Sequence, residues 1–110
     1  MSSMNIEVLY IDGCAQYESF AAHLEHLLHK HGVDSHLRHV LVRTNQEAEQ
    51  LRFLGSPTLR MNGVDVDPAA AQRTDYGIQC RLYPTDLGYR STPPDEWILA
   101  EAERARVLDK

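Results

Sequence analysis

The chain contains little that would direct it to a membrane, a nucleic acid or an oxidising compartment. Only two of its 110 residues are cysteine, and no apolar run approaches the roughly 18–20 residues needed to span a bilayer. The first residues, Met-Ser-Ser-Met-Asn, have neither the basic region nor the apolar segment of a secretory signal. The formal charge is −5 and the basic residues are scattered. We therefore expect a cytoplasmic protein whose partners are neither nucleic acids nor membranes.

The chain also lacks the common motifs of cofactor and metal sites. It has no phosphate-binding glycine loop, no Ser-His-Asp arrangement and no Cys-x-x-Cys zinc spacing. Its six histidines all lie between residues 23 and 39. His23, His26 and His29 follow the polar side of an expected helix without a convergent third ligand, so we interpret them as a solvated face. We predict no cofactor and no native metal site.

The hydrophobic share of 43% and the charged share of 25% are ordinary for a globular protein, and the length fits one domain over residues 1–110. Hydrophobic periodicity and turn residues predict the elements. The expected strands are 5–11, 35–43, 58–61 and 64–66, and the expected helices are 15–31, 44–54 and 93–108. The order β-α-β-α-β-β-α predicts an α/β fold with a four-stranded mixed sheet and helices on both faces.

Two local signals support these boundaries. Thr44 and Glu47 have the spacing of a capping box at the start of the second helix. Asn62-Gly63 is a strong hairpin signal, because both turn positions require positive φ. Asp65 and Asp67 follow this turn, and we interpret them as edge charges that discourage pairing with other chains.

Residues 68–92 form an irregular segment without a clear period, and this segment carries Cys80. A loop of this length is uncommon in a small domain unless it is functional or contains short elements. Its tyrosines suggest that the segment packs onto the body of the domain.

Cys14 lies where the first strand leads into the first helix, within Ile-Asp-Gly-Cys. At a first helical turn, backbone N–H groups and the positive end of the helix dipole favour a thiolate. Thiolate is the form that attacks disulfides and binds soft metals. The alternative is that Cys14 only fills space beneath the strand. We favour a reactive thiol.

The element order, the cysteine at the strand–helix junction and "GSPT" before the hairpin together resemble the thioredoxin-like fold over residues 5–67 and 93–108. The resemblance implies that Cys14 is the nucleophile and that Pro57 is a cis-proline beside it. It also implies a substrate-binding role for Ser56, Pro57 and Thr58, in which Ser56 offers backbone hydrogen bonds to an extended substrate. The residues alone do not assign the isomer of the Ser56–Pro57 bond.

"FLGSPTLRMNGVDVDP" and "DYGIQCRLYPT" resemble a narrower branch of small bacterial thioredoxin-like proteins, mostly uncharacterised. Some members carry labels taken from alkylmercury lyase. The Gly-x-x-Cys-Arg-x-Tyr element of that branch is matched here by Gly77, Cys80, Arg81 and Tyr83. Arg81 is then either a surface charge or a functional residue that pairs with a carboxylate or lowers the pKa of Cys80.

Tyr17 departs from the main family, because it stands where thioredoxins carry their second cysteine. Cys14 then either works alone with an external thiol such as glutathione, or is resolved by Cys80, provided that their Cα atoms lie within roughly 7 Å. Tyr17 either packs or donates a hydrogen bond to the thiolate. The catalytic candidates are therefore Cys14, Cys80 and Tyr17.

Three hypotheses of function follow. The first is thiol–disulfide exchange through Cys14 with a protein or small-molecule thiol or disulfide as substrate. The second is a non-catalytic binding module that holds a peptide or a partner subunit in the groove near Pro57. The third is the binding of a soft cation such as Hg(II) or Cu(I) between Cys14 and Cys80. The oligomeric state is not predicted.

Overall fold

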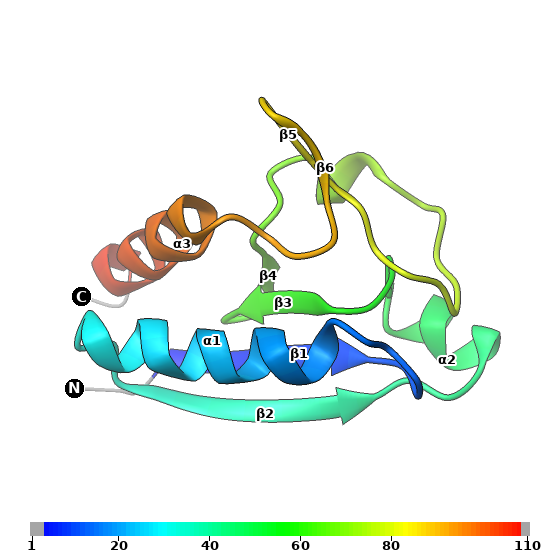
Figure 1. The fold of residues 1–110 in the computed structure, drawn as a ribbon, viewed down its shortest axis with the longest axis horizontal. Coiled ribbons are helices and arrows are strands. Elements are labelled where there is room, and N and C mark those ends of the chain that lie inside the picture. Colours follow the sequence, from blue (N-terminus) through cyan, green and yellow to red (C-terminus); the bar gives the residue numbers. More distant parts are fainter. Residues whose placement is uncertain (1–3, 109–110) are drawn as a thin grey trace.

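A four-stranded mixed sheet forms the centre of the structure, a computed structural model that describes residues 4–108 (Figure 1). The strands are β1 (Met4–Tyr10), β2 (Ser35–Leu41), β3 (Thr58–Met61) and β4 (Val64–Asp65). Their order is β2-β1-β3-β4, with β2 parallel to β1 and with β3 and β4 each antiparallel to the preceding neighbour. The predicted mixed sheet is confirmed.

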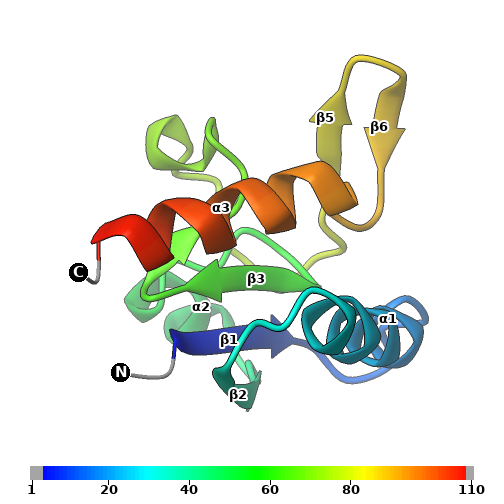
Figure 2. The ribbon, with the colours of Figure 1, turned by 90° about the vertical axis from the view of Figure 1, so that its left-hand side faces the viewer.

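Helices cover both faces of this sheet, as predicted. Helices α1 (Tyr17–Lys30) and α3 (Asp95–Leu108) lie on one face, where their apolar residues pack against Ile6 and Val8 of β1 (Figure 2). The short helix α2 (Asn45–Gln50) lies on the other face, where Ala48 and Phe53 pack against Leu9. Consecutive strand residues point to opposite faces, so β1 supplies both cores. No helix within residues 4–108 is both long enough and apolar enough to cross a membrane.

The two local signals are confirmed. The Thr44 hydroxyl accepts a hydrogen bond from the Glu47 N–H at 3.0 Å. The Glu47 carboxylate accepts a hydrogen bond from the Arg43 N–H at 2.8 Å. The donor of this reciprocal bond is therefore the residue before the N-cap and not the N-cap itself. Asn62 and Gly63 have φ values of 52° and 82°, which joins β3 to β4 by a tight turn.

The irregular segment contains three short elements that the sequence pattern did not reveal. A 3-10 turn, η1 (Ala70–Gln72), is followed by an antiparallel hairpin of β5 (Tyr83–Thr85) and β6 (Gly88–Arg90). Figures 1 and 2 show this hairpin projecting away from the sheet. Leu87 is 86% exposed and Tyr89 is 73% exposed. Strands of three residues are too short to show the alternation by which strands are recognised.

The Thr44 cap is expected to contribute measurably to folding. Replacing Thr44 with Ala removes the acceptor for the Glu47 N–H and should lower the free energy of unfolding by about 1 kcal/mol. Urea denaturation followed by circular dichroism measures this change. Thr44→Ser keeps the acceptor and should remain close to wild type; an equal loss in both variants would contradict the capping role.

Candidate functional site at the end of strand β1

Ser56 joins three segments at the end of β1. Its side chain is buried, and its Oγ accepts a hydrogen bond from the Ile11 N–H at 3.2 Å. Its N–H donates to the Gln79 carbonyl at 2.9 Å, and its carbonyl accepts from the Arg81 N–H at 3.0 Å. These bonds form a parallel bridge between Ser56 and Cys80. The Ser56–Pro57 peptide bond is cis, as the resemblance implied.

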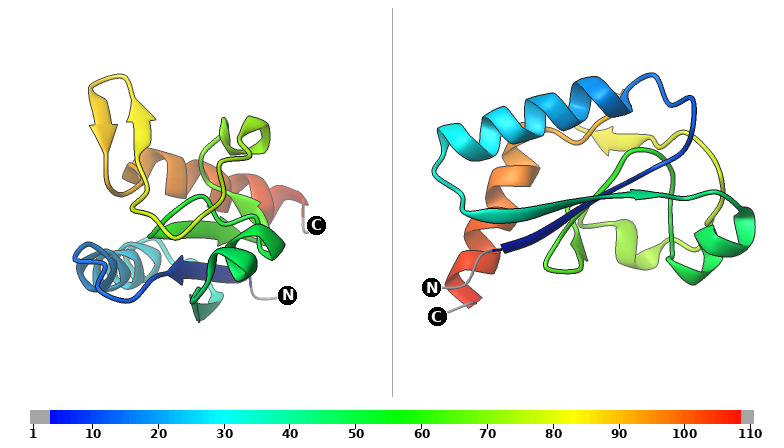
Figure 3. Two further views of the ribbon diagram at one scale, coloured as in Figure 1. Left: turned by 90° about the vertical axis from the view of Figure 1, so that its right-hand side faces the viewer. Right: turned by 90° about the horizontal axis from the view of Figure 1, so that it is seen from below.

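Residues 77–83, here called the strap, therefore lie where the resemblance placed a substrate. Figure 3 shows the strap, in yellow tones, crossing the end of the sheet at which β1 leads into α1. Ser56, Pro57 and Thr58 are all buried. The residue predicted to pair with an extended substrate thus pairs with the chain itself.

Further contacts hold the first half of the strap. The Gly77 N–H donates to the Phe53 carbonyl at 3.1 Å, and the Ile78 N–H donates to the Asn45 side chain at 3.0 Å. The Gln79 amide donates to the Leu54 carbonyl at 3.1 Å. The strap is therefore attached to α2 and to the segment that follows it, as well as to Ser56.

The guanidinium of Arg81 anchors the second half of the strap. Its side chain is completely buried and donates to both carboxylate oxygens of Asp65, at 2.7 and 3.0 Å. It also donates to the Thr58 hydroxyl at 3.1 Å, and it lies 3.5 Å from the Asp67 carboxylate. Arg81 is thus the partner of a carboxylate, and the alternative of a surface charge is wrong.

The interpretation of Asp65 and Asp67 as edge charges is also wrong. Both carboxylates turn toward the strap, because the strap brings a buried cation against β4. Asp67 is only 3% exposed, and its Oδ2 has no hydrogen-bond partner, as is also true of Arg81 Nε. Burial lowers the pKa of Arg81, but Tyr83 and the two carboxylates outweigh it and raise that pKa above its ordinary value. The guanidinium therefore stays charged.

Tyr83 fastens the end of the strap to the cis-proline. Its hydroxyl donates to the Pro57 carbonyl at 2.6 Å, and the guanidinium of Arg81 lies 4.3 Å from its ring centre. Burial raises the pKa of Tyr83 far above its usual value, so the hydroxyl remains a donor. Gly55 permits this close packing: its φ is +128°, and a Cβ there would lie 2.9 Å from the Cα of Arg81.

The two cysteines are free thiols, Cys14 on the loop that follows β1 and Cys80 in the strap opposite Ser56. Cys14 is half-buried and Cys80 is exposed. Helix α1 begins at Tyr17 with Gln16 as its N-cap, so the expectation that Cys14 occupies the first helical turn is wrong. Asp12 and Gly13 form a turn that delays the helix, and the Cys14 N–H donates to the Ile11 carbonyl at 3.4 Å. Stabilisation of its thiolate by backbone amides stays a prediction.

Tyr17 faces strand β2. Its ring stacks on Tyr10 with a centroid distance of 3.8 Å, and its hydroxyl lies 2.6 Å from His39 Nδ1. Burial raises the pKa of Tyr17, and the neighbouring Tyr10 raises it further. The hydroxyl is therefore engaged with His39, and the proposed bond to the Cys14 thiolate stays a prediction.

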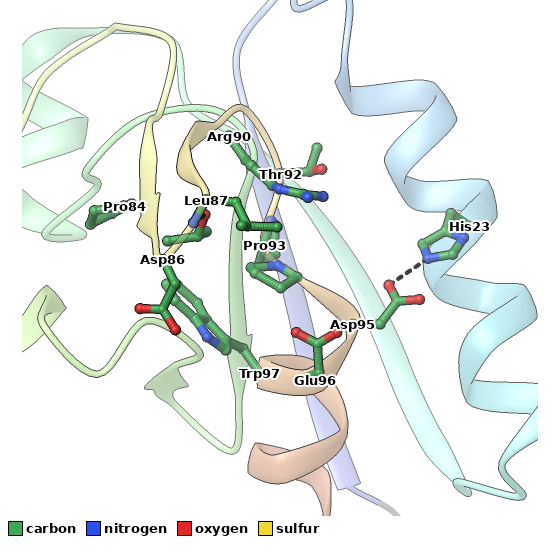
Figure 4. Close-up of a pocket in the computed structure, with 12 residues that line it drawn as sticks. His23, Pro84, Asp86, Leu87, Arg90, Thr92, Pro93, Asp95, Glu96 and Trp97 are labelled. Atoms are coloured by element: carbon green, nitrogen blue, oxygen red, sulfur yellow. Dashed lines mark hydrogen bonds and ion pairs between the residues drawn. The ribbon is translucent and has the colours of Figure 1, made fainter.

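A separate cavity of about 620 Å³ lies between the β5–β6 hairpin and the start of α3 (Figure 4). Trp97, Pro93 and Arg90 line it, and His23 of α1 closes one side by pairing with Asp95 at 2.7 Å. None of the predicted site residues lines this cavity. Sequence reasoning missed it, because the hairpin that forms one wall has no periodic signal. Among the described residues, no group of three or more histidine, cysteine or acidic side chains is arranged to hold a metal ion.

No family model, curated protein or solved structure matches this chain. The function is therefore inferred from the chemistry of the site.

Loss of the Arg81 cation should destabilise the protein strongly. Arg81→Met leaves the Asp67 carboxylate buried without its cation and should lower the free energy of unfolding by about 3–5 kcal/mol. Thermal and urea denaturation measure the loss. The double variant Arg81→Met/Asp67→Asn removes the uncompensated charge and should recover part of it. If the double variant is no more stable than Arg81→Met, the carboxylate is not the source of the cost.

Proposed function

We propose that the chain is a thioredoxin-like protein that carries out thiol–disulfide exchange, with Cys14 as nucleophile and Cys80 as resolving thiol. The order of the strands, the loop cysteine after β1 and the buried Ser56–Pro57 before β3 support the resemblance. The observation that carries the proposal is the bridge between Ser56 and Cys80.

Ser56 contacts the segment of Cys80 through this main-chain bridge and the end of β1 through its side chain. Residues paired across a parallel ladder project their side chains to the same face. The Ser56 hydroxyl meets the Ile11 N–H, and the Ile11 carbonyl accepts from the Cys14 N–H. The Cys80 side chain is therefore expected on the side of Ser56 that faces the Cys14 loop. This arrangement supports Cys80 as the resolving thiol, which is the role of the second cysteine in thioredoxins.

The exchange would run in two balanced steps. The Cys14 thiolate attacks one sulfur of a disulfide R–S–S–R, forms Cys14–S–S–R and releases one R–S⁻. The Cys80 thiolate then attacks the Cys14 sulfur, forms the Cys14–Cys80 disulfide and releases the second R–S⁻. The substrate gains two electrons and the protein loses two. A low-molecular-weight thiol, oxidised in turn, restores both cysteines.

The binding-module hypothesis is less well supported by this site. A partner peptide at Ser56 would have to displace the strap, whose contacts include the two bonds to Ser56 and the buried Arg81 cluster. An extended peptide has no free main-chain group of Ser56 to pair with.

The nucleophile role of Cys14 and the resolving role of Cys80 predict different products for the single variants. Reduced wild-type protein treated with glutathione disulfide should form an internal Cys14–Cys80 disulfide, whereas Cys80→Ser should stop at Cys14 carrying one glutathione. Cys14→Ser should form no internal disulfide. Intact mass spectrometry and peptide mapping identify each product.

Leu82→Ala serves as the control, because it alters an exposed side chain beside Cys80 and leaves both thiols in place. Cys14 that labels no faster than an ordinary exposed thiol would refute the exchange function. Tight Hg(II) binding that each single cysteine variant abolishes, without reaction with disulfides, would instead support the soft-metal hypothesis.

A further inference from the structure

We infer that the substrates are low-molecular-weight disulfides and that extended polypeptides are excluded, because the strap occupies the main-chain pairing position at Ser56. This inference rests on the proposed function and names the substrate class of the same site. The inference depends on the pairing of Gln79 and Arg81 with the main-chain N–H and carbonyl of Ser56.

Both hydrogen-bonding groups that Ser56 can offer to an extended chain are already used. The Ser56 N–H donates to Gln79 and its carbonyl accepts from Arg81, with Cys80 directly opposite. An incoming peptide would need the same donor and acceptor. Ser56 itself is 1% exposed, so a peptide cannot approach it while the strap is in place.

The strap is held at both ends, so a weakly bound peptide does not readily replace it. Gly77 is bonded to Phe53 at one end, and Tyr83 is bonded to the cis-proline carbonyl at the other. Between them, Arg81 is locked by Asp65 and packed against Gly55. Displacing the strap would expose a buried guanidinium and leave the buried Asp67 and the partly buried Asp65 uncompensated, which is costly.

A small disulfide does not meet this obstacle. Cys80 is an exposed residue of the strap and Cys14 is half-buried, so solvent reaches both cysteines while the strap is in place. A molecule that requires no main-chain pairing reaches Cys14 without moving the strap. Cys80 then takes the place that a substrate cysteine would have in an open groove.

Two probes with the same reacting bond test this inference. One is glutathione disulfide, and the other is an extended peptide whose single cysteine is a mixed disulfide with glutathione. A groove that adds two main-chain hydrogen bonds should accelerate the peptide by about 30-fold over glutathione disulfide. For wild type we expect no such preference in stopped-flow rates of Cys14 oxidation. Hydrogen exchange should show the Arg81 amide equally protected with and without the peptide.

Gly55→Ala is the strap-releasing variant, because its new Cβ collides with the Cα of Arg81. It should react faster with the peptide, while Leu82→Ala, which alters only an exposed strap side chain, should behave as wild type. If Gly55→Ala does not fold, the wild-type rates and the hydrogen exchange still decide. A strong peptide preference in wild type, or loss of Arg81 protection on adding peptide, overturns the substrate class alone. Failure of Cys14 to react with either probe overturns both the proposed function and this inference.

Discussion

The ion pair between the buried Arg81 and the partly buried Asp65 is the interaction on which the candidate site depends. It joins the strap to the edge strand β4, and the same guanidinium contacts Thr58 just after the cis-proline. A cation without exposure to water needs its full set of partners, because removing one leaves an uncompensated charge. The position of Cys80 follows from this contact, since Cys80 is the residue immediately before Arg81.

Ser56 connects the strap that Arg81 holds with the end of β1. Its side chain meets the end of β1, and its main chain meets the strap, so one buried serine connects the loop of Cys14 with the segment of Cys80. The polar groups of Ser56 are satisfied within the chain, as buried groups generally are. Because its main-chain N–H and carbonyl are already paired, Ser56 has no hydrogen-bonding group to offer to a peptide from outside the chain. A single set of bonds therefore supports both the dithiol proposal and the restriction to small substrates.

The fold was largely predictable because its signals are local. The strands and helices of the sheet were expected from periodicity, and the Thr44 cap and the Asn62-Gly63 turn act over a few residues. The errors fell where the deciding contact is distant in sequence. The sequence favours edge charges for the carboxylates at 65 and 67, since nothing near them indicates that a cation 16 residues from Asp65 reaches it.

The sequence by itself determined the mixed sheet, the order of its four strands and three helices, and the positions of one cysteine before and one after Ser56-Pro57 along the chain, because these follow from residue type and spacing. Only the tertiary structure decided what pairs with Ser56, whether Arg81 is buried, and that helix α1 begins three residues after Cys14. The physical reason is that an irregular segment has no periodicity to indicate where it packs. Its position depends on the match between one charged side chain and two carboxylates that the sheet brings within reach.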